Sequence, residues 1–238
     1  MTTYVLVHGA WAGAHTFSSV RPLLHAAGHQ VFTPSLTGIG ERSHLASPQV
    51  TLTTHIADVV NMVLFEDLND IVLLGFSYGG AVVTGTLDHI ADRVAHLVYL
   101  DAFVPNNGES IDSIRGAMPV GHGPELVTVG SEWLIAPRIR TYEDPAVEAW
   151  ATPRRSSQPA KTFSEPVHLA QPLEDFPFTL TYIKALGDPR IDGQTNPFYD
   201  AADRAKASAR WRYRETTSNH MIPNNRPGEL AEWLLELA

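Results

Sequence analysis

Cysteine is absent from this 238-residue chain, so we expect no disulfide framework, no thiolate metal site and no cysteine nucleophile. Basic residues are in the minority, since 17 Lys and Arg stand against 26 Asp and Glu and give a net charge of -9. No basic run offsets this balance, which argues against a nucleic-acid partner or an anionic membrane surface. No apolar run reaches the roughly 18 residues that are needed to span a bilayer.

The N-terminal stretch MTTYVLVHGAW has no basic region and only a short apolar run, so it is not typical of a signal peptide. A chain of this length and ordinary composition can bury one sizeable core. We therefore expect a soluble, cytoplasmic protein of one or two domains.

Apolar, β-branched runs alternate with helical patterns through most of the chain. We expect strands at 3–9, 29–36, 70–77, 96–103, 178–188 and 211–219, and helices at 16–28, 51–66, 196–208 and 226–238, with a further helix directly after residue 77. This alternation predicts a parallel sheet that is covered on both faces. Residues 106–177 interrupt it, are rich in proline and are too long for an ordinary loop, so we interpret them as an inserted cap on a core formed by residues 1–105 and 178–238.

The segment GFSYGG, residues 75–80, lies where an expected strand meets an expected helix. Its first five residues fit G-x-S-x-G, the pattern of a nucleophile elbow, in which a serine occupies a sharp and strained turn. Small residues are needed on both sides of that serine because neighbouring Cβ atoms would clash. The pattern predicts Ser77 as a nucleophile at a helix N-terminus, where free N–H groups favour developing negative charge.

A serine hydroxyl needs a base, and the base needs a group that orients it. In folds whose nucleophile lies on such an elbow, the catalytic residues follow the chain order serine, acid, histidine. His220 follows the expected strand 211–219, so we expect it at the same sheet edge as Ser77 and assign it as the base. We prefer Asp188, which ends the preceding strand, as the acid. Asp192 and Asp101 are the alternatives, although we favour a turn-capping role for Asp101.

Acyl transfer also needs two backbone N–H groups directed at the tetrahedral oxygen. We expect these from Tyr78, which follows the nucleophile, and from Ala10, in the loop after the first strand. His8 precedes that loop, and we expect it to hold the loop by hydrogen bonds rather than to act as a base. Large apolar side chains that fit a substrate pocket, and fit a core position equally well, are Trp11, Met118, Trp133, Phe163 and Met221.

No metal site and no cofactor are expected. The eleven histidines include no close ligand pair such as H-E-x-x-H. The segment TGIGERSH has the first two glycines of a dinucleotide-binding pattern but lacks the third, and there is no Walker motif.

With VLVHGAW, GFSYGG, LGDPRI and SNHM in this order, the chain resembles the α/β-hydrolase superfamily. More narrowly, it is similar to the branch that contains plant methylesterases, plant hydroxynitrile lyases and bacterial carboxylesterases of similar length. The resemblance implies a mostly parallel sheet of about six strands with helices on both faces and an inserted cap. It also implies Ser77 as nucleophile, His220 as base, Asp188 as its partner, and Ala10 and Tyr78 as oxyanion donors. Dimers are common in the branch, so a homodimer is compatible with it.

The expected function is hydrolysis of a small carboxylic ester through an acyl-enzyme. A hydroxynitrile lyase is the first alternative. Lyases of this branch have threonine after the first-strand histidine and lysine after the catalytic histidine, whereas Gly9 and Met221 occupy these positions here, which is the esterase pattern. The second alternative is a small-molecule receptor of hydrolase fold with poor turnover, since such receptors can keep an intact triad.

Overall fold

A computed structural model describes residues 1–115, 132–191 and 193–238. Six parallel strands form its main sheet in the order β2-β1-β3-β4-β7-β8. The strands are β1 (Thr3–Val7), β2 (Gln30–Phe32), β3 (Ile71–Phe76), β4 (Val94–Leu100), β7 (Thr179–Ala185) and β8 (Trp211–Thr216). The predicted six-stranded parallel sheet is thus confirmed, with every expected strand present.

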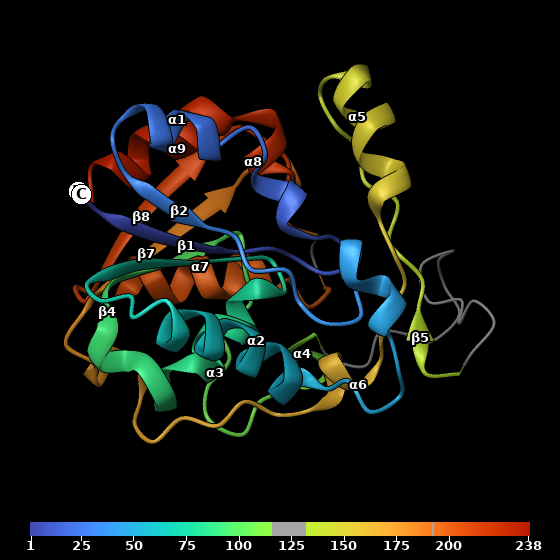
Figure 1. Ribbon diagram of the computed structural model, residues 1–238, viewed down its shortest axis with the longest axis horizontal. Helices are drawn as coiled ribbons and strands as arrows, with labels where there is room; N and C mark the ends of the chain where they lie inside the picture. The colour runs from blue at the N-terminus through green and yellow to red at the C-terminus, as the bar shows by residue number, and fades with distance from the viewer. Residues whose placement is uncertain (116–131, 192) are drawn as a thin grey trace.

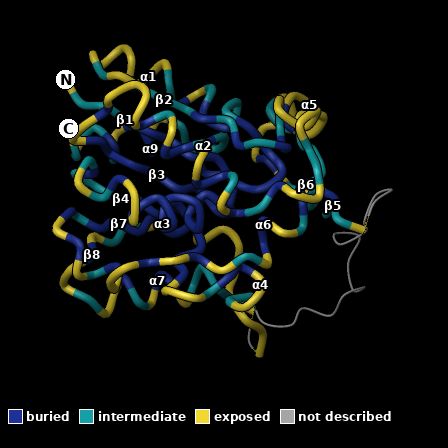
Figure 2. Tube along the Cα trace, turned by 60° about the horizontal axis from the view of Figure 1, so that its bottom comes forward, coloured by how far each residue is buried: buried dark blue, intermediate teal, exposed yellow. Residues whose placement is uncertain are grey.

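Helices cover both faces of the sheet, as Figure 1 shows. One face carries α1 (Arg21–Ala26) and α9 (Pro227–Leu235), and the other carries α2 (Leu52–Phe65), α3 (Gly79–Ile90) and α7 (Pro197–Ala207). The inward side chains divide into two hydrophobic clusters, one on each side of the sheet. Strand β3 is buried along its whole length, which the unbroken apolar run IVLLGF requires. The central strands are accordingly the most deeply buried part of the chain in Figure 2.

Two expected elements differ most from those observed. The helix expected at 16–28 is divided into η1 (Ala14–Phe17) and α1, with Pro22 in the first turn of α1. The strand expected at 29–36 is only three residues long as β2, because Pro34 has no N–H to continue a ladder. A short helix, α8 (Ile222–Asn225), follows the loop that contains His220.

The described part of the segment between β4 and β7, which we call the β4–β7 connection, consists of short elements. Its elements are α4 (Ile111–Ile114), β5 (Leu134–Ile135), α5 (Pro145–Ala151), η5 (Thr152–Arg154), β6 (Gln158–Pro159), α6 (Lys161–Ser164) and η6 (Leu173–Asp175), and β5 pairs with β6 in an antiparallel ribbon. Phe163, Val167 and Leu169 anchor the connection in the main core, whereas α5 stands away from the sheet in Figure 1 and is largely exposed in Figure 2. That residues 106–177 act as a cap stays a prediction.

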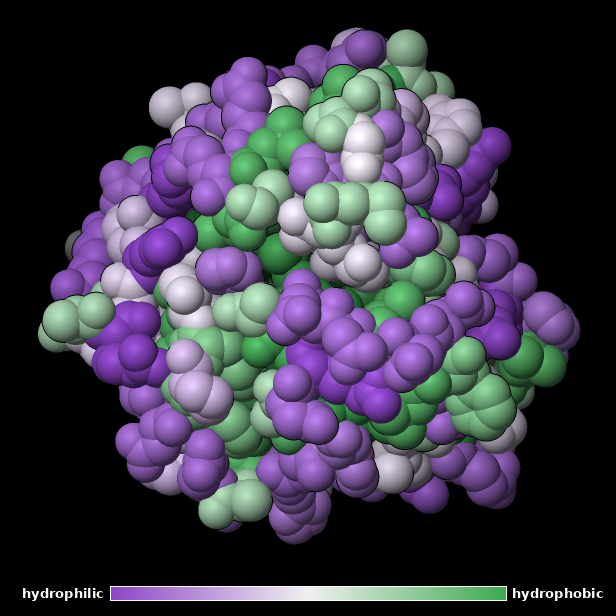
Figure 3. All heavy atoms as spheres, turned by 60° about the vertical axis from the view of Figure 1, so that its left-hand side comes forward, coloured by the Kyte–Doolittle hydropathy of each residue, from purple (hydrophilic) through white to green (hydrophobic). Residues whose placement is uncertain are grey.

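Within the connection, α5, β5 and α6 lie on the side of the sheet toward which the arrowheads of β7 and β8 point in Figure 1. Figure 3 shows the opposite end of the molecule, where hydrophilic side chains cover much of the face and hydrophobic ones lie between them. Within the described ranges, no helix has the length and apolar character that a bilayer crossing requires. Among the described residues, two further short helices, η2 (Gly40–Leu45) and η3 (Ala91–Arg93), lie in loops of the sheet core.

Candidate active site

Ser77 occupies the turn between β3 and α3 with a φ of 55°, a left-handed conformation that is uncommon for a residue other than glycine. The flanking glycines permit the turn. A Cβ on Gly75 would lie 2.6 Å from the carbonyl oxygen of Gly79, and a Cβ on Gly79 would lie 2.6 Å from the carbonyl oxygen of Val7. Neither contact is sterically allowed, so only glycine fits at both positions. The strand-turn-helix geometry expected around Ser77 is therefore present.

His220 lies beside Ser77, with 2.9 Å between its Nε2 and Ser77 Oγ. Its ring lies between two aromatic side chains. The ring of Phe198 stacks on it with centroids 5.1 Å apart, and the ring of Phe76 lies 4.9 Å away at a tilt. This apolar sandwich restricts rotation of the imidazole and buries it, with only 4% of the residue exposed.

The other ring nitrogen of His220 contacts Asp101 and not Asp188. Asp101 Oδ2 lies 2.7 Å from His220 Nδ1, whereas the Asp188 carboxylate accepts a hydrogen bond of 2.8 Å from the backbone N–H of His220. The expectation that Asp188 partners the imidazole is therefore corrected, because the loop after β7 places this exposed aspartate against the main chain of the histidine loop. Asp192, the other alternative in that loop, lies outside the described residues.

Asp101 reaches the imidazole because the chain turns sharply at the end of β4. Its φ is 40°, its N–H donates to Ile183 O at 2.7 Å, and its side chain is 1% exposed. The turn-capping role favoured for Asp101 is wrong, because its buried carboxylate faces the site and contacts His220. Its second oxygen, Oδ1, accepts from Lys184 Nζ at 2.7 Å and from the N–H of Ala185 at 3.2 Å. Both oxygens of the buried carboxylate are thus satisfied.

These contacts fix the protonation states. Burial alone would raise the pKa of Asp101, but its hydrogen bond to His220 and the positive charges around it outweigh burial and hold the pKa below its usual value. Burial, and after it the charge of Arg140, lowers the pKa of His220. An ionised carboxylate only accepts, so Nδ1 of His220 carries the proton and Nε2 accepts from the Ser77 hydroxyl. Ser77, His220 and Asp101 therefore form a continuous chain of hydrogen bonds.

The two expected oxyanion donors lie beside Ser77. Ala10 and Tyr78 both line the cavity at this site. Within the described part of the chain, neither backbone N–H donates to a protein acceptor, so both amides are available to an oxygen bound above Ser77. A hydrogen bond holds the Tyr78 side chain, since its hydroxyl lies 2.8 Å from Nδ1 of His55. Nε2 of His55 in turn donates to Thr37 O at 2.7 Å.

The loop that carries Ala10 is held from two sides. His8 Nε2 accepts from the N–H of Leu36 at 3.2 Å, and its Nδ1 donates to Gly9 O at 2.8 Å. Burial lowers the pKa of His8 to about 4, so it stays neutral near pH 7. Gln158 Oε1, on β6, accepts from the N–H of Trp11 at 2.9 Å. His8 thus positions the loop, as the sequence indicated, and the β4–β7 connection contributes the second contact.

A cavity of about 410 Å³ opens beside Ser77. Of the proposed pocket residues, Trp11 and Phe163 line it, and their rings pack together with centroids 5.6 Å apart. Trp133 and Met221 are not among its described lining residues. Met221 is buried in the hydrophobic cluster on the other side of the sheet from Trp11 and Phe163, because the chain enters α8 directly after His220. Met118 lies outside the described residues.

Sequence reasoning missed Lys184 and two cavity-lining arginines, Arg138 and Arg140. A lysine inside the otherwise uncharged strand TLTYIKA was a usable signal, because a buried ammonium needs an anionic partner. The β4–β7 register pairs Leu100 with Ile183, so the next positions along the two strands are Asp101 and Lys184. The arginines follow β5 in a segment whose sequence shows no catalytic pattern.

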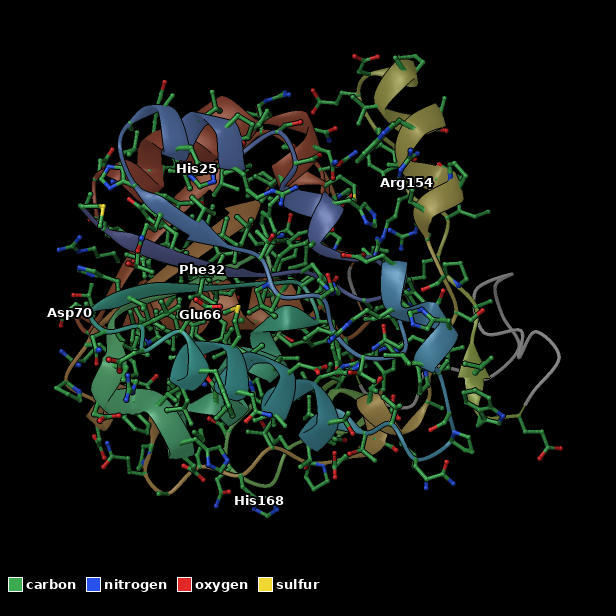
Figure 4. The ribbon with its side chains drawn as sticks, in the orientation of Figure 1. His25, Phe32, Glu66, Asp70, Arg154 and His168 are labelled. Carbon is green, nitrogen blue, oxygen red and sulfur yellow. The ribbon has the colours of Figure 1, made fainter. Side chains whose placement is uncertain are left out.

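His25 and His168 lie away from this site. Figure 4 shows His25 on α1 and His168 at the far edge of the molecule, and both are exposed. In the described ranges, no group of three or more His, Cys, Asp or Glu side chains is arranged to hold a metal ion.

A parallel sheet with a serine at its strand-helix elbow, hydrogen-bonded to a histidine and a buried aspartate, defines the class of α/β hydrolases. The family described as the alpha/beta hydrolase family matches residues 4–233, and the chain belongs to it.

Relatives within the family include esterases. A stretch of 126 residues is 48% identical to a carbendazim hydrolyzing esterase from Nocardioides sp. (strain SG-4G), and it covers 53% of this chain and 51% of that protein. A stretch of 137 residues is 30% identical to methylesterase 2 of Arabidopsis thaliana, over 54% of this chain and 52% of the relative. The chain thus spans about half the length of the curated relatives it matches.

The fold is also shared with solved structures. An extracellular alpha/beta-hydrolase from a Paenibacillus species superimposes with a TM-score of 0.83 at 24% identity, over 100% of this chain and 99% of that one. At this level of identity, the likeness concerns the fold.

Proposed function

We propose that this protein hydrolyses small carboxylic esters through an acyl-enzyme on Ser77. The observation that carries the proposal is the hydrogen-bond chain from Ser77 Oγ to His220 Nε2 and from His220 Nδ1 to Asp101 Oδ2. The names of the esterase relatives support the same reaction class.

In the proposed mechanism, His220 Nε2 takes the hydroxyl proton as Ser77 Oγ attacks the ester carbonyl carbon. The amides of Ala10 and Tyr78 donate to the tetrahedral oxyanion. His220 then returns the proton to the departing alkoxide, and the alcohol leaves. Water, deprotonated by the same nitrogen, attacks the acyl group and regenerates Ser77. Asp101 holds the imidazole in the tautomer with the proton on Nδ1 and stabilises the imidazolium.

The principal test is the variant Ser77→Ala, assayed with p-nitrophenyl acetate under multiple turnover. We expect loss of hydrolysis with an unchanged circular dichroism spectrum, because only one hydroxyl is removed. Mass spectrometry of the wild type, quenched during turnover, should show an acetyl adduct on the peptide that contains Ser77. Activity of the variant within about tenfold of wild type would contradict the assignment of Ser77.

A hydroxynitrile lyase is the alternative of different chemistry. A Cβ on Gly9 would lie 3.0 Å from Ser77 Cβ and 3.3 Å from the ring of Phe76, so a side chain at this position would crowd the nucleophile. Met221 offers no charge to a departing cyanide. We expect benzaldehyde release from mandelonitrile to be negligible beside ester turnover at equal concentration.

The receptor alternative predicts a single acylation without turnover, which the multiple-turnover assay distinguishes. A cytoplasmic location and a homodimer stay predictions.

A further inference from the structure

Among the described residues that line the cavity beside Ser77, positive charges outnumber negative ones. The charged residues that line it are Arg115, Arg138, Arg140, Lys184, Asp101 and Asp188. Lys184 pairs with Asp101 at 2.7 Å, and Arg138 and Arg140 then outnumber Asp188. The whole chain has a net charge of -9, so the local balance is opposite to that of the protein. The positive charge of the cavity therefore comes from the particular residues that line it and not from the overall composition.

Two of these arginines come from one short segment of the β4–β7 connection. Arg138 and Arg140 are partly buried and line the cavity, while Ile139 between them is 79% exposed. In an extended chain, alternate side chains point to the same side. The sequence PRIR thus presents two guanidinium groups to the cavity and one apolar side chain to solvent.

Among the described residues, these two guanidinium groups and that of Arg155 have no ion-pair partner. In residues 1–115, 132–191 and 193–238, none of Arg138, Arg140 and Arg155 forms an ion pair. Arg138 Nη2 and Arg155 Nε are buried there without a hydrogen-bond partner. Burial, together with the like charges of Arg155 and Arg138, lowers the pKa of Arg140 to about 10 against the opposing effect of the Asp188 and Asp101 carboxylates, so Arg140 remains charged near pH 7.

Gathering like charges with unsatisfied donors is unfavourable unless an anion balances them. A guanidinium is a planar fork of N–H donors that matches a carboxylate in a bidentate arrangement. The cavity, at about 410 Å³, is within the range that accommodates small ligands. The same cavity contains the nucleophile, so a bound anion would belong to the substrate itself.

We propose that Arg138 and Arg140 form a subsite for a carboxylate carried by the substrate, so that this enzyme prefers half-esters of small dicarboxylic acids. The inference rests on the proposed ester hydrolysis and specifies its substrate class. Binding of the distal carboxylate places the ester group at Ser77, between the amides of Ala10 and Tyr78.

The test compares two esters of equal reach. Mono-p-nitrophenyl glutarate carries the distal carboxylate, and p-nitrophenyl hexanoate has an ethyl group in its place. We expect kcat/KM for the glutarate to exceed that for the hexanoate by at least about tenfold at low ionic strength, with the difference falling as salt is added. The variants Arg138→Gln and Arg140→Gln should each lower this ratio several-fold, mainly through KM for the glutarate.

Arg154→Gln is the matched control. Arg154 belongs to the same connection but is exposed, with its guanidinium 4.4 Å from the ring centroid of Trp150, and Figure 4 shows it on the part of the chain that stands away from the sheet. We expect the ratio to be unchanged in this variant. The subsite would be overturned if the enzyme preferred the hexanoate, or if Arg138→Gln and Arg140→Gln left the glutarate-to-hexanoate ratio of kcat/KM unaltered. Either result would leave the proposed ester hydrolysis intact.

A binding measurement separates the subsite from the reaction. Monomethyl glutarate should bind the Ser77→Ala protein in calorimetry, and adding Arg138→Gln should weaken binding about tenfold. If neither p-nitrophenyl ester is hydrolysed by the wild type, the proposed function fails. The subsite is then supported by arginine-dependent binding and is overturned by binding that is absent or independent of Arg138.

Discussion

Lys184 Nζ lies 2.7 Å from Asp101 Oδ1, and both side chains are almost completely buried. The ammonium also lies 4.1 Å from the ring centroid of Tyr199, which covers it from the α7 side. The carboxylate that orients His220 is therefore itself oriented by a neighbouring strand. This relationship explains how an aspartate at the end of β4 can remain ionised in a buried position.

Asp101→Asn should abolish most activity. The amide can donate to His220 Nδ1 and would favour the imidazole tautomer that cannot accept the serine proton, so we expect kcat to fall by up to about 10⁴. Asp188→Asn should cost less than about tenfold, because the asparagine oxygen can still accept from the backbone N–H of His220. Steady-state kinetics of both variants decides between the two carboxylates. A larger loss in Asp188→Asn would contradict the assignment of Asp101.

Lys184→Met should destabilise the protein through Asp101. Removing one partner of a buried ion pair leaves an unpaired charge, which costs about 3 kcal/mol or more. Urea denaturation of Lys184→Met, Asp101→Asn and the double variant measures the coupling. We expect the double variant to recover part of the loss, since the asparagine side chain carries no charge. Strictly additive losses would show that the pair contributes little.

The pH dependence of kcat/KM should follow His220, which must be neutral to act as the base. Burial and the charge of Arg140 lower its pKa below the ordinary 6.5, so activity should rise through an ionisation below that value and level off above it. Arg140→Gln removes a nearby positive charge and should move the rising limb to higher pH, whereas Arg154→Gln should not. A wild-type midpoint clearly above 6.5 would contradict this environment for His220.

Acid should destabilise the protein through two buried histidines outside the hydrogen-bond chain. Burial lowers the pKa values of His8 and His55 to about 4 each, against 6.5 in the unfolded chain. Both side chains are neutral in the folded and the unfolded protein above pH 6.5, so their full contribution to the free energy of unfolding is present there. As pH falls toward 4, the unfolded chain binds protons first. Each of the two histidines should then lower the free energy of unfolding by on the order of 3 kcal/mol.

Urea denaturation at a series of pH values measures this loss. His55→Gln should flatten the pH dependence of the free energy of unfolding, whereas replacing the exposed His168 should leave it unaltered. An equally steep pH dependence in His55→Gln would argue against the lowered pKa of His55.

The sequence by itself determined the sheet, the elbow and the base. Alternation of β-rich and helical runs is a local property, and glycines at 75 and 79 are needed wherever a strand turns so sharply into a helix. His220 was readable because the loop after the last strand of a parallel sheet opens at the same edge as the elbow. These features depend on chain order and local geometry, and both can be read from one sequence.

Only the tertiary structure decided which aspartate meets the imidazole and what charge the cavity carries. Asp101 and Asp188 both end strands of the sheet and both precede the histidine, so chain order cannot separate them. The choice depends on the left-handed turn at Asp101, on Lys184 of the adjacent strand, and on a loop that directs Asp188 to the histidine main chain. The two arginines are 61 or more positions beyond Ser77 in the chain, and their proximity to it arises from folding of the β4–β7 connection over the sheet edge.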